Sequence, residues 1–205
     1  MKEIVFVDID TQIDFMLPQG KLYVRDAQTL IPNLKYLTRT ALENDILIIS
    51  SVDTHIKNDP EFKQFPAHCV AGNNGAKKIP QTLHKEHIVI PQKILSKKAL
   101  YAKVKEYAQV ILQKNTYDIF VNMNLLQLLR PFRAAFVYGV ALDYCVKYAV
   151  LGLLQRGLEV YLITDATKPV DVAQGKALLE KFKSNGVRLI KAKDVQKEIR
   201  RIARE

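Results

Sequence analysis

Short runs of consecutive apolar residues recur along this chain and limit its fold more than any other feature. They lie at Glu3–Ile9, Ile46–Val52, Gln109–Gln113, Ala134–Tyr138, Glu159–Ile163 and Val187–Ile190. Within these runs Val, Ile, Leu and Phe follow one another without polar alternation, which is typical of strands buried on both faces of a parallel sheet. The region His84 to Tyr107, in the basic segment 84–113, is ambiguous: HIVIP is typical of a short strand and KKALYAKVKEYA of a helix.

Amphipathic helical patterns separate these runs. They cover about Ala27 to Asn44, Leu125–Leu129, Asp143–Arg156, Val172–Asn185 and Asp194–Ala203, and a long loop with Pro and Gly runs from Asp53 to Pro80. Helices of about 12 residues suit right-handed crossovers between parallel strands. No repeat or linker indicates a second domain. We therefore predict one domain, residues 1–205, with a three-layer, doubly wound α/β fold, a mainly parallel sheet of about six strands and the first strand near its centre.

Composition excludes several classes of protein. The chain is 48% hydrophobic and 25% charged, as an ordinary globular domain is. It has no apolar run near the ~20 residues of a membrane span. Met-Lys-Glu leads directly into IVFVDI, too early for a secretory signal, so we expect a cytoplasmic protein without membrane contact. Two cysteines, Cys69 and Cys145, cannot build a disulfide framework and favour free, catalytic or metal-binding thiols.

The formal net charge is +10, and many of the Lys and Arg residues are spread through Lys93 to Lys114 and Lys176 to Arg204. They often lie at helical spacing beside Glu or Asp and are not packed into a run with interleaved aromatic residues. This pattern favours a solvated basic surface over a nucleic-acid or anionic-surface role, so we expect no specific nucleic-acid partner.

Reactive side chains follow four of the predicted strands. Asp10 follows the first, Asp53 and His55 end the second, Lys114 ends the next, and Cys145 comes shortly after Gly139. In doubly wound folds, ligands bind beyond the carboxyl ends of the strands. These side chains should therefore meet at one edge of the sheet, which indicates an enzyme.

Cys145 is the candidate nucleophile. Asp143 is placed to cap the helix that runs through Val150, and Cys145 would lie in its first turn, where free N–H groups favour a thiolate and can hold an oxyanion. A buried structural cysteine is the alternative. Asp10 as the base and Lys114 as the positive group would complete an Asp/Lys/Cys triad.

A metal site is the second candidate feature. Asp53 and His55 are separated by a single residue at a strand end, so in an extended backbone their side chains point the same way. With His68 they would form a carboxylate-and-imidazole site with open positions. The alternative is a loop cap and an exposed histidine. Cys69, beside His68, is the second-choice nucleophile or a fourth ligand, but no helix start lies there to activate it.

Five blocks of the chain together resemble the isochorismatase-like cysteine hydrolases, and within them the nicotinamidase-like branch. They are DTQIDF at Asp10–Phe15, DTH at Asp53–His55, FPAHCVAGNNGA at Phe65–Ala76, K-x-x-YDIF at Lys114–Phe120 and GVALDYCV at Gly139–Val146. The blocks occur in the family's order and span nearly the whole chain.

The resemblance implies the family's doubly wound fold, with catalytic roles on Asp10, Lys114 and Cys145. It also implies one divalent metal on Asp53, His55 and His68, with zinc as the first expectation and iron or manganese as alternatives. A cis peptide would join Val140 to Ala141 and aim the N–H groups of Ala141 and Cys145 at the oxyanion.

Two departures concern the substrate. Nicotinamidases commonly have D-W-H-P where this chain has DTHI, and Y-S-A-F where it has YDIF; the chain has no Trp. Phe15, Leu22 and Tyr117 are the candidates for the pocket wall. We expect an amidohydrolase acting on a small carboxamide, with nicotinamide as the first choice and a role in NAD salvage.

Three alternatives can be compared with that expectation. In the first, the chemistry is the same but the substrate is another amide, or a ureido or carbamoyl compound. In the second, the chain is an isochorismatase proper, but those enzymes lack the cysteine and the metal trio. A non-catalytic basic binding protein should have lost part of the triad, and none is lost. The sequence does not fix whether copies of the chain assemble.

Overall fold

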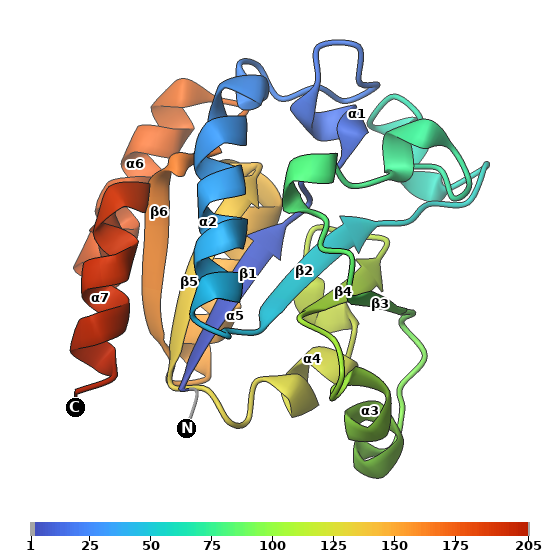
Figure 1. Ribbon diagram of the computed structural model, residues 1–205. Helices are drawn as coiled ribbons and strands as arrows, with labels where there is room; N and C mark the ends of the chain where they lie inside the picture. The colour runs from blue at the N-terminus through green and yellow to red at the C-terminus, as the bar shows by residue number, and fades with distance from the viewer. Residues whose placement is uncertain (1–2, 205) are drawn as a thin grey trace.

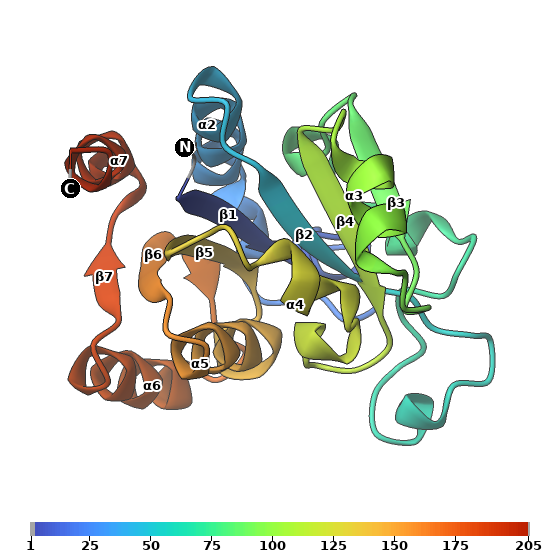
Figure 2. The same cartoon turned by 90° about the horizontal axis from the view of Figure 1, so that it is seen from below.

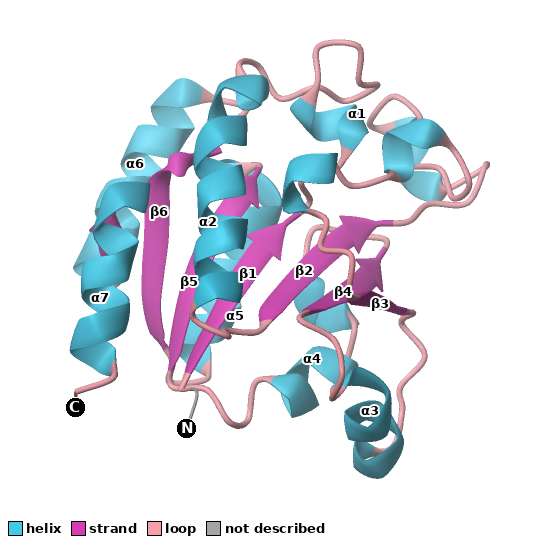
Figure 3. Cartoon of the chain, viewed as in Figure 1, coloured by secondary structure: helices cyan, strands magenta, loops and turns pink. Residues whose placement is uncertain are grey.

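The computed structural model describes residues 3–204, which build one seven-stranded sheet with all neighbouring strands parallel (Figures 1 and 3). The order across the sheet is β3-β4-β2-β1-β5-β6-β7. The strands are β1 Ile4–Ile9, β2 Ile48–Asp53, β3 His87–Ile90, β4 Gln109–Lys114, β5 Ala134–Val140, β6 Glu159–Lys168 and β7 Arg188–Ile190. This confirms the predicted fold class and the central place of the first strand.

Helices cover both faces of the sheet, as the view along it shows (Figure 2). One face packs on α2 (Ile31–Glu43) and α7 (Val195–Ile202), and the other on α3 (Lys97–Val104), α4 (Asn124–Leu128), α5 (Lys147–Gln155) and α6 (Val172–Ser184). Every residue of β1, β2 and β5 is buried, which is why these strands lack polar alternation. Among the described residues, no helix has both the length and the apolar character needed to cross a membrane.

Two local details differ from the predicted elements. The segment 84–113 supplies both a strand and a helix, so the sheet has seven strands where about six were expected. The helix expected from Ala27 divides into a 3-10 turn, Ala27–Leu30, and α2, which has proline in its first turn. Proline has no N–H to donate, so a helix start accommodates Pro32 without losing a hydrogen bond.

A buried ion pair connects the long loop after β2 to the central strand. The Lys78 ammonium lies 2.7 Å from the Asp8 carboxylate and donates to the Thr11 hydroxyl, also over 2.7 Å. Ser50 on β2 donates to the same Asp8 carboxylate. These contacts hold the loop against β1 at a position two residues before Asp10.

The last two strands differ in length. β7 pairs only with Tyr161–Ile163 of β6, while β6 continues to Lys168 beside β5. The sheet therefore ends in a step: beyond Ile163, no strand within residues 3–204 covers the outer edge of β6.

Candidate active site

Four strand ends bring the predicted catalytic side chains to one edge of the sheet. Asp10 directly follows β1, Asp53 and Lys114 end β2 and β4 as paired residues, and Cys145 lies in the turn after β5. Asp10 has a left-handed backbone with φ of 48°, which turns the chain where β1 ends. All four side chains are buried.

The ammonium of Lys114 is the centre of this group. Its Nζ lies 2.8 Å from Asp10 Oδ2 and 3.6 Å from Cys145 Sγ, and it also contacts Asp53 Oδ1. The Ser51 hydroxyl donates to the other Asp10 oxygen over 2.6 Å. The structure thus brings Asp10, Lys114 and Cys145 into direct contact.

Burial sets the protonation of this group. It raises the pKa of Asp10, although Lys114 pulls in the opposite direction. Burial disfavours charge on Lys114, but Asp10 and Asp53 outweigh it and hold the pKa of the ammonium well above its usual range. Burial, followed by the Asp10 carboxylate, raises the pKa of the Cys145 thiol. Burial therefore opposes the thiolate that a helix start was expected to favour, while the Lys114 ammonium supports it.

A close approach of two strands shapes the turn that carries Cys145. Gly139 has φ of 112°, and a Cβ there would lie 2.0 Å from the carbonyl oxygen of Ile9, so no other residue fits. The next peptide bond, Val140–Ala141, is cis, at the position that the family resemblance implied. The Ala141 carbonyl accepts hydrogen bonds from both Tyr144 and Val146, and Leu142–Val146 forms a π-helical turn that leads into α5.

The prediction that Asp143 caps the nucleophile helix is wrong. The turn begins at Ala141 and has no side-chain cap. The Asp143 carboxylate instead accepts from the backbone N–H groups of Val170 and Asp171 over 2.9 and 2.8 Å. Asp143 therefore fastens the β6–α6 connection to the nucleophile turn.

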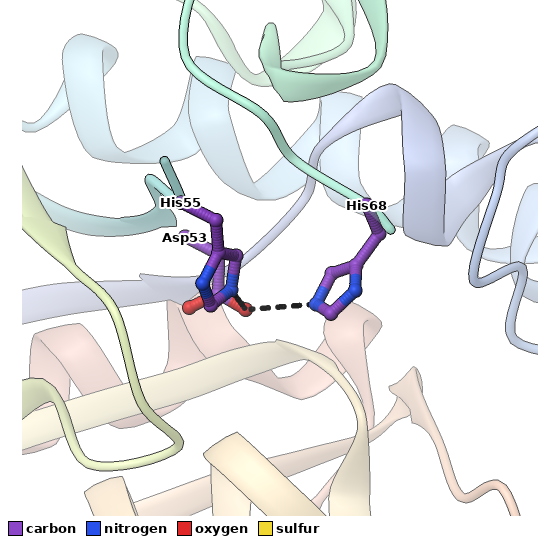
Figure 4. Close-up of side chains that lie close together, drawn as sticks. All are labelled: Asp53, His55 and His68. Atoms are coloured by element: carbon purple, nitrogen blue, oxygen red, sulfur yellow. Dashed lines mark ion pairs between the residues drawn. The ribbon is translucent and has the colours of Figure 1, made fainter. Parts of the chain in front are cut away.

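Asp53, His55 and His68 converge beside the triad (Figure 4). Nε2 of each histidine lies 3.9 Å from Asp53 Oδ2. The second ring nitrogens are held by other partners: His55 Nδ1 lies 3.0 Å from the Asp59 carboxylate, and His68 Nδ1 lies 2.8 Å from the Pro66 carbonyl. Such partners orient a histidine so that the opposite nitrogen faces a metal.

The donor set fits a divalent transition metal. Neither ring nitrogen of His55 makes a hydrogen bond: Nδ1 has only its ion-pair contact with Asp59, and Nε2 is buried without a hydrogen-bond partner, as expected for an atom whose partner is an ion. One carboxylate and two imidazoles suit zinc, iron or manganese. Burial lowers the pKa of His68 and so favours the neutral ring that ligation requires. For His55, the carboxylates of Asp53 and Asp59 outweigh burial and raise its pKa, so a metal must displace a proton there at low pH.

A cavity of about 120 Å³ opens onto the thiol. The three predicted wall residues, Phe15, Leu22 and Tyr117, line it together with Cys145, Asp53 and His68. Cys69 is also buried, but it is not among the lining residues, and its N–H is bound to the Asp14 carboxylate. Burial, followed by nearby carboxylates, raises the pKa of the Cys69 thiol.

Sequence reasoning missed six residues of the cavity: Tyr23, Val24, Glu61, Phe65, Tyr144 and Val170. Glu61 Oε1 lies 3.9 Å from His68 Nε2, next to the metal trio. Phe65 and Tyr144 lie inside blocks that carried the family resemblance, which was their available signal. Glu61 had no comparable signal, because nothing in its spacing separates it from the other polar residues of the loop.

The isochorismatase domain family model matches residues 5–194. A nicotinamidase of Acinetobacter baylyi is 24% identical over 183 residues, 80% of each chain. The crystal structure of the Pyrococcus horikoshii pyrazinamidase in complex with zinc superposes with a TM-score of 0.75 at 27% identity, covering 92% of this chain and 99% of the other. PnC1 from L. infantum, solved in complex with nicotinate, gives a TM-score of 0.71 at 25% identity over 93% of both chains. The chain belongs to the isochorismatase family.

Proposed function

We propose that this protein is a metal-dependent cysteine amidohydrolase that releases ammonia from a small carboxamide, with nicotinamide as the best candidate and a role in NAD salvage. One observation carries the proposal: the Lys114 ammonium contacts Asp10 and Cys145 while also touching Asp53, the carboxylate of the candidate metal trio. A nucleophile, a base and a metal site are thereby joined around one cavity.

The cavity and the relatives both favour a small, flat, aromatic amide. Phe15, Phe65, Tyr117 and Tyr144 supply aromatic surface around the thiol, and Tyr117 and Tyr144 lie with ring centroids 5.4 Å apart. Planar substrates pack well against such walls. The relatives include a nicotinamidase, a pyrazinamidase solved in complex with zinc and a protein solved in complex with nicotinate.

Acylation begins with the neutral Cys145 thiol. Asp10, whose raised pKa makes it a stronger base than an ordinary carboxylate, takes the thiol proton as the sulfur attacks the amide carbon. The N–H groups of Ala141 and Cys145 receive the developing oxyanion, and one such donor is worth roughly 3–4 kcal/mol in comparable sites. Asp10 then returns the proton to the leaving ammonia, which leaves a thioester on Cys145.

Deacylation uses the same carboxylate. Asp10 removes a proton from water, the hydroxide attacks the thioester, and the thiol leaves with the proton that Asp10 returns. Lys114 keeps its charge throughout and stabilises whichever neighbour is anionic. A divalent metal held by Asp53, His55 and His68 would supply a Lewis acid with open positions for substrate or water.

A second candidate substrate class is a ureido or carbamoyl compound. Glu61 lines the cavity, so its carboxyl group can accept hydrogen bonds from the additional N–H groups of such a substrate. The absence of tryptophan from the whole chain also removes one wall that a pyridine ring would use in the typical nicotinamidase.

Ammonia release from nicotinamide, pyrazinamide, benzamide and an N-carbamoyl amino acid tests the proposal. The assay compares metal-reconstituted with chelator-treated protein. We expect the highest kcat/KM with nicotinamide, and an adduct on Cys145 by mass spectrometry after rapid quenching. A higher kcat/KM with the N-carbamoyl compound would select the second class. Hydrolysis that persists without the Cys145 thiol would show that the reaction does not proceed through a thioester.

A further inference from the structure

A second cavity, of about 420 Å³, lies at the step in the sheet edge. It forms because β6 runs to Lys168 while β7 covers only Tyr161–Ile163, which leaves open space between the outer edge of β6 and α6. The residues that line it are all different from those lining the thiol cavity. It is therefore a separate binding volume, within the size range of small-molecule sites.

Positive charge gathers around this cavity. Lys168, Lys176 and Lys191 line it and come from β6, α6 and the residue after β7. Within residues 3–204, none of these three ammonium groups forms an ion pair with a carboxylate. The one acidic lining residue, Asp165, has its carboxylate engaged by the Ala192 N–H over 2.8 Å. Asp165 keeps its negative charge, so the lining carries three ammonium groups against one carboxylate, an excess of positive charge that favours an anion.

Thr167 gives an independent indication of a ligand. It lines the cavity, is only 5% exposed, and its hydroxyl has no hydrogen-bond partner. Leaving a buried hydroxyl unpaired is unfavourable, and such groups call for a specific partner. The other two threonines of the cavity are satisfied: Thr164 donates to the Ile190 carbonyl and Thr29 to the Asp26 carbonyl.

The rest of the lining defines the ligand class. Leu30, Leu142, Val172 and Leu179 give the cavity apolar surface next to the lysines. An inorganic anion would use only the charged part. Lysine is a common ligand of phosphate, and three lysines against one engaged carboxylate suit a dianion. We propose that this cavity binds a small organic phosphate, with the phosphate on the three lysines and the Thr167 hydroxyl, and the organic group on the leucines and Val172.

Calorimetric titration with phenyl phosphate and with inorganic phosphate tests the proposal on the intact protein. We expect phenyl phosphate to bind at least several-fold more tightly. Lys168→Gln/Lys176→Gln/Lys191→Gln should weaken phenyl phosphate binding by at least about tenfold, since charged hydrogen bonds are lost. The matched control Lys97→Gln/Lys98→Gln/Lys103→Gln changes the net charge equally on α3, at the other end of the sheet, and should bind as the wild type does (Figure 1).

Thr167→Val gives the most specific readout. It removes only an unpartnered hydroxyl, so the unfolding free energy should stay constant or rise while phenyl phosphate binding weakens by about tenfold. All three variants should keep wild-type amidase activity, because none alters the thiol cavity.

Four outcomes would overturn the proposal. Equal weakening in both triple variants would show a general charge effect. Unchanged affinity in the Lys168/Lys176/Lys191 variant would place the anion elsewhere, for instance on the metal trio. Unchanged affinity in Thr167→Val would show that the ligand does not contact the Thr167 hydroxyl. Equal affinity for both probes would show that the cavity does not bind the organic group of the ligand.

Discussion

The side chain of Gln12 binds both backbone polar groups of Asp53. Its Oε1 accepts from the Asp53 N–H over 2.7 Å, and its Nε2 donates to the Asp53 carbonyl over 2.9 Å. The same Nε2 donates to the Ala76 carbonyl over 2.8 Å. The side-chain amide of Gln12 therefore pairs with the end of β2 as the backbone of a neighbouring strand would. It fixes the backbone from which Asp53 reaches both Lys114 and the two histidines.

We predict that Gln12→Ala weakens metal binding. Asp53 would lose two hydrogen bonds to its backbone, and its carboxylate would no longer be held opposite His55 and His68. Removing partners that orient metal ligands typically lowers metal affinity by roughly 10- to 100-fold. Titration of metal-free protein with zinc against a competing chelator measures this change.

Gln64→Ala is the matched control for that experiment, because Gln64 is exposed on the same loop and has no contact with the trio. Its zinc affinity should equal that of the wild type. Wild-type zinc affinity in Gln12→Ala would show that the backbone of Asp53 does not need this support.

We predict that His55→Ala/His68→Ala loses the metal but keeps the fold. Hydrophobic cores on both faces of the sheet stabilise the fold, so a metal here would orient groups in a fold that is already stable. Elemental analysis should give one divalent metal per wild-type chain and none for the variant, with unchanged far-UV circular dichroism. A wild-type protein that binds no transition metal after reconstitution would refute the metal site.

The two cysteines should differ sharply in their contribution to activity. Cys145→Ala should reduce kcat by at least about 10³-fold, because the nucleophile of a covalent mechanism is lost. Cys69→Ala should change kcat by less than about threefold, since Cys69 lies outside the cavity, although a small cavity in the core will lower stability. Ammonia release and chemical denaturation measure both effects. An inactive Cys69→Ala protein would reassign the nucleophile.

The sequence was most informative where burial and local pattern agree. In β1, β2 and β5 every residue is buried, so their apolar runs could be recognised directly. β3 was harder, because it has four residues, only one of them buried, and lies at the sheet edge. The π-helical turn at Leu142–Val146 was not predictable, since it arises from two N–H groups sharing the Ala141 carbonyl.

The candidate site followed the same rule. Asp10, Asp53 and Lys114 could be grouped from the sequence because parallel strands bring their carboxyl ends together. Asp59 could not, because its contact with His55 depends on how the loop folds back. The raised pKa of Cys145 could not be foreseen either, because its position near a helix start says nothing of its burial beside Asp10.

Lys78→Met should destabilise the protein by about 3–5 kcal/mol, because it leaves the Asp8 carboxylate buried without its counter-charge. Replacing both, as Asp8→Val/Lys78→Met, should recover most of this loss, since apolar pairs often replace buried ion pairs without cost. Lys77→Met, at the exposed neighbouring position, is the control and should be neutral. Urea denaturation gives all three values. A double variant no more stable than Lys78→Met would show that Asp8 is needed by Thr11 and Ser50 instead.

The last prediction concerns pH. Asp10 must be ionised to act as a base, so kcat/KM falls as pH drops through the Asp10 pKa, which burial raises and Lys114 lowers. Lys114→Met removes the lowering influence, so the acid limb of the profile should move to higher pH.

A carboxyl with a raised folded-state pKa contributes stability at low pH that is lost as pH rises through that pKa. The stability deficit of Lys114→Met should therefore be larger at neutral than at acidic pH. Lys147→Met removes the same charge from α5, at a lysine that is not among the groups shifting the Asp10 pKa, and should leave the limb in place. The profile of kcat/KM and urea denaturation at both pH values provide the measurements. An acid limb that moves to lower pH in Lys114→Met would mean that a group other than Asp10 is the base.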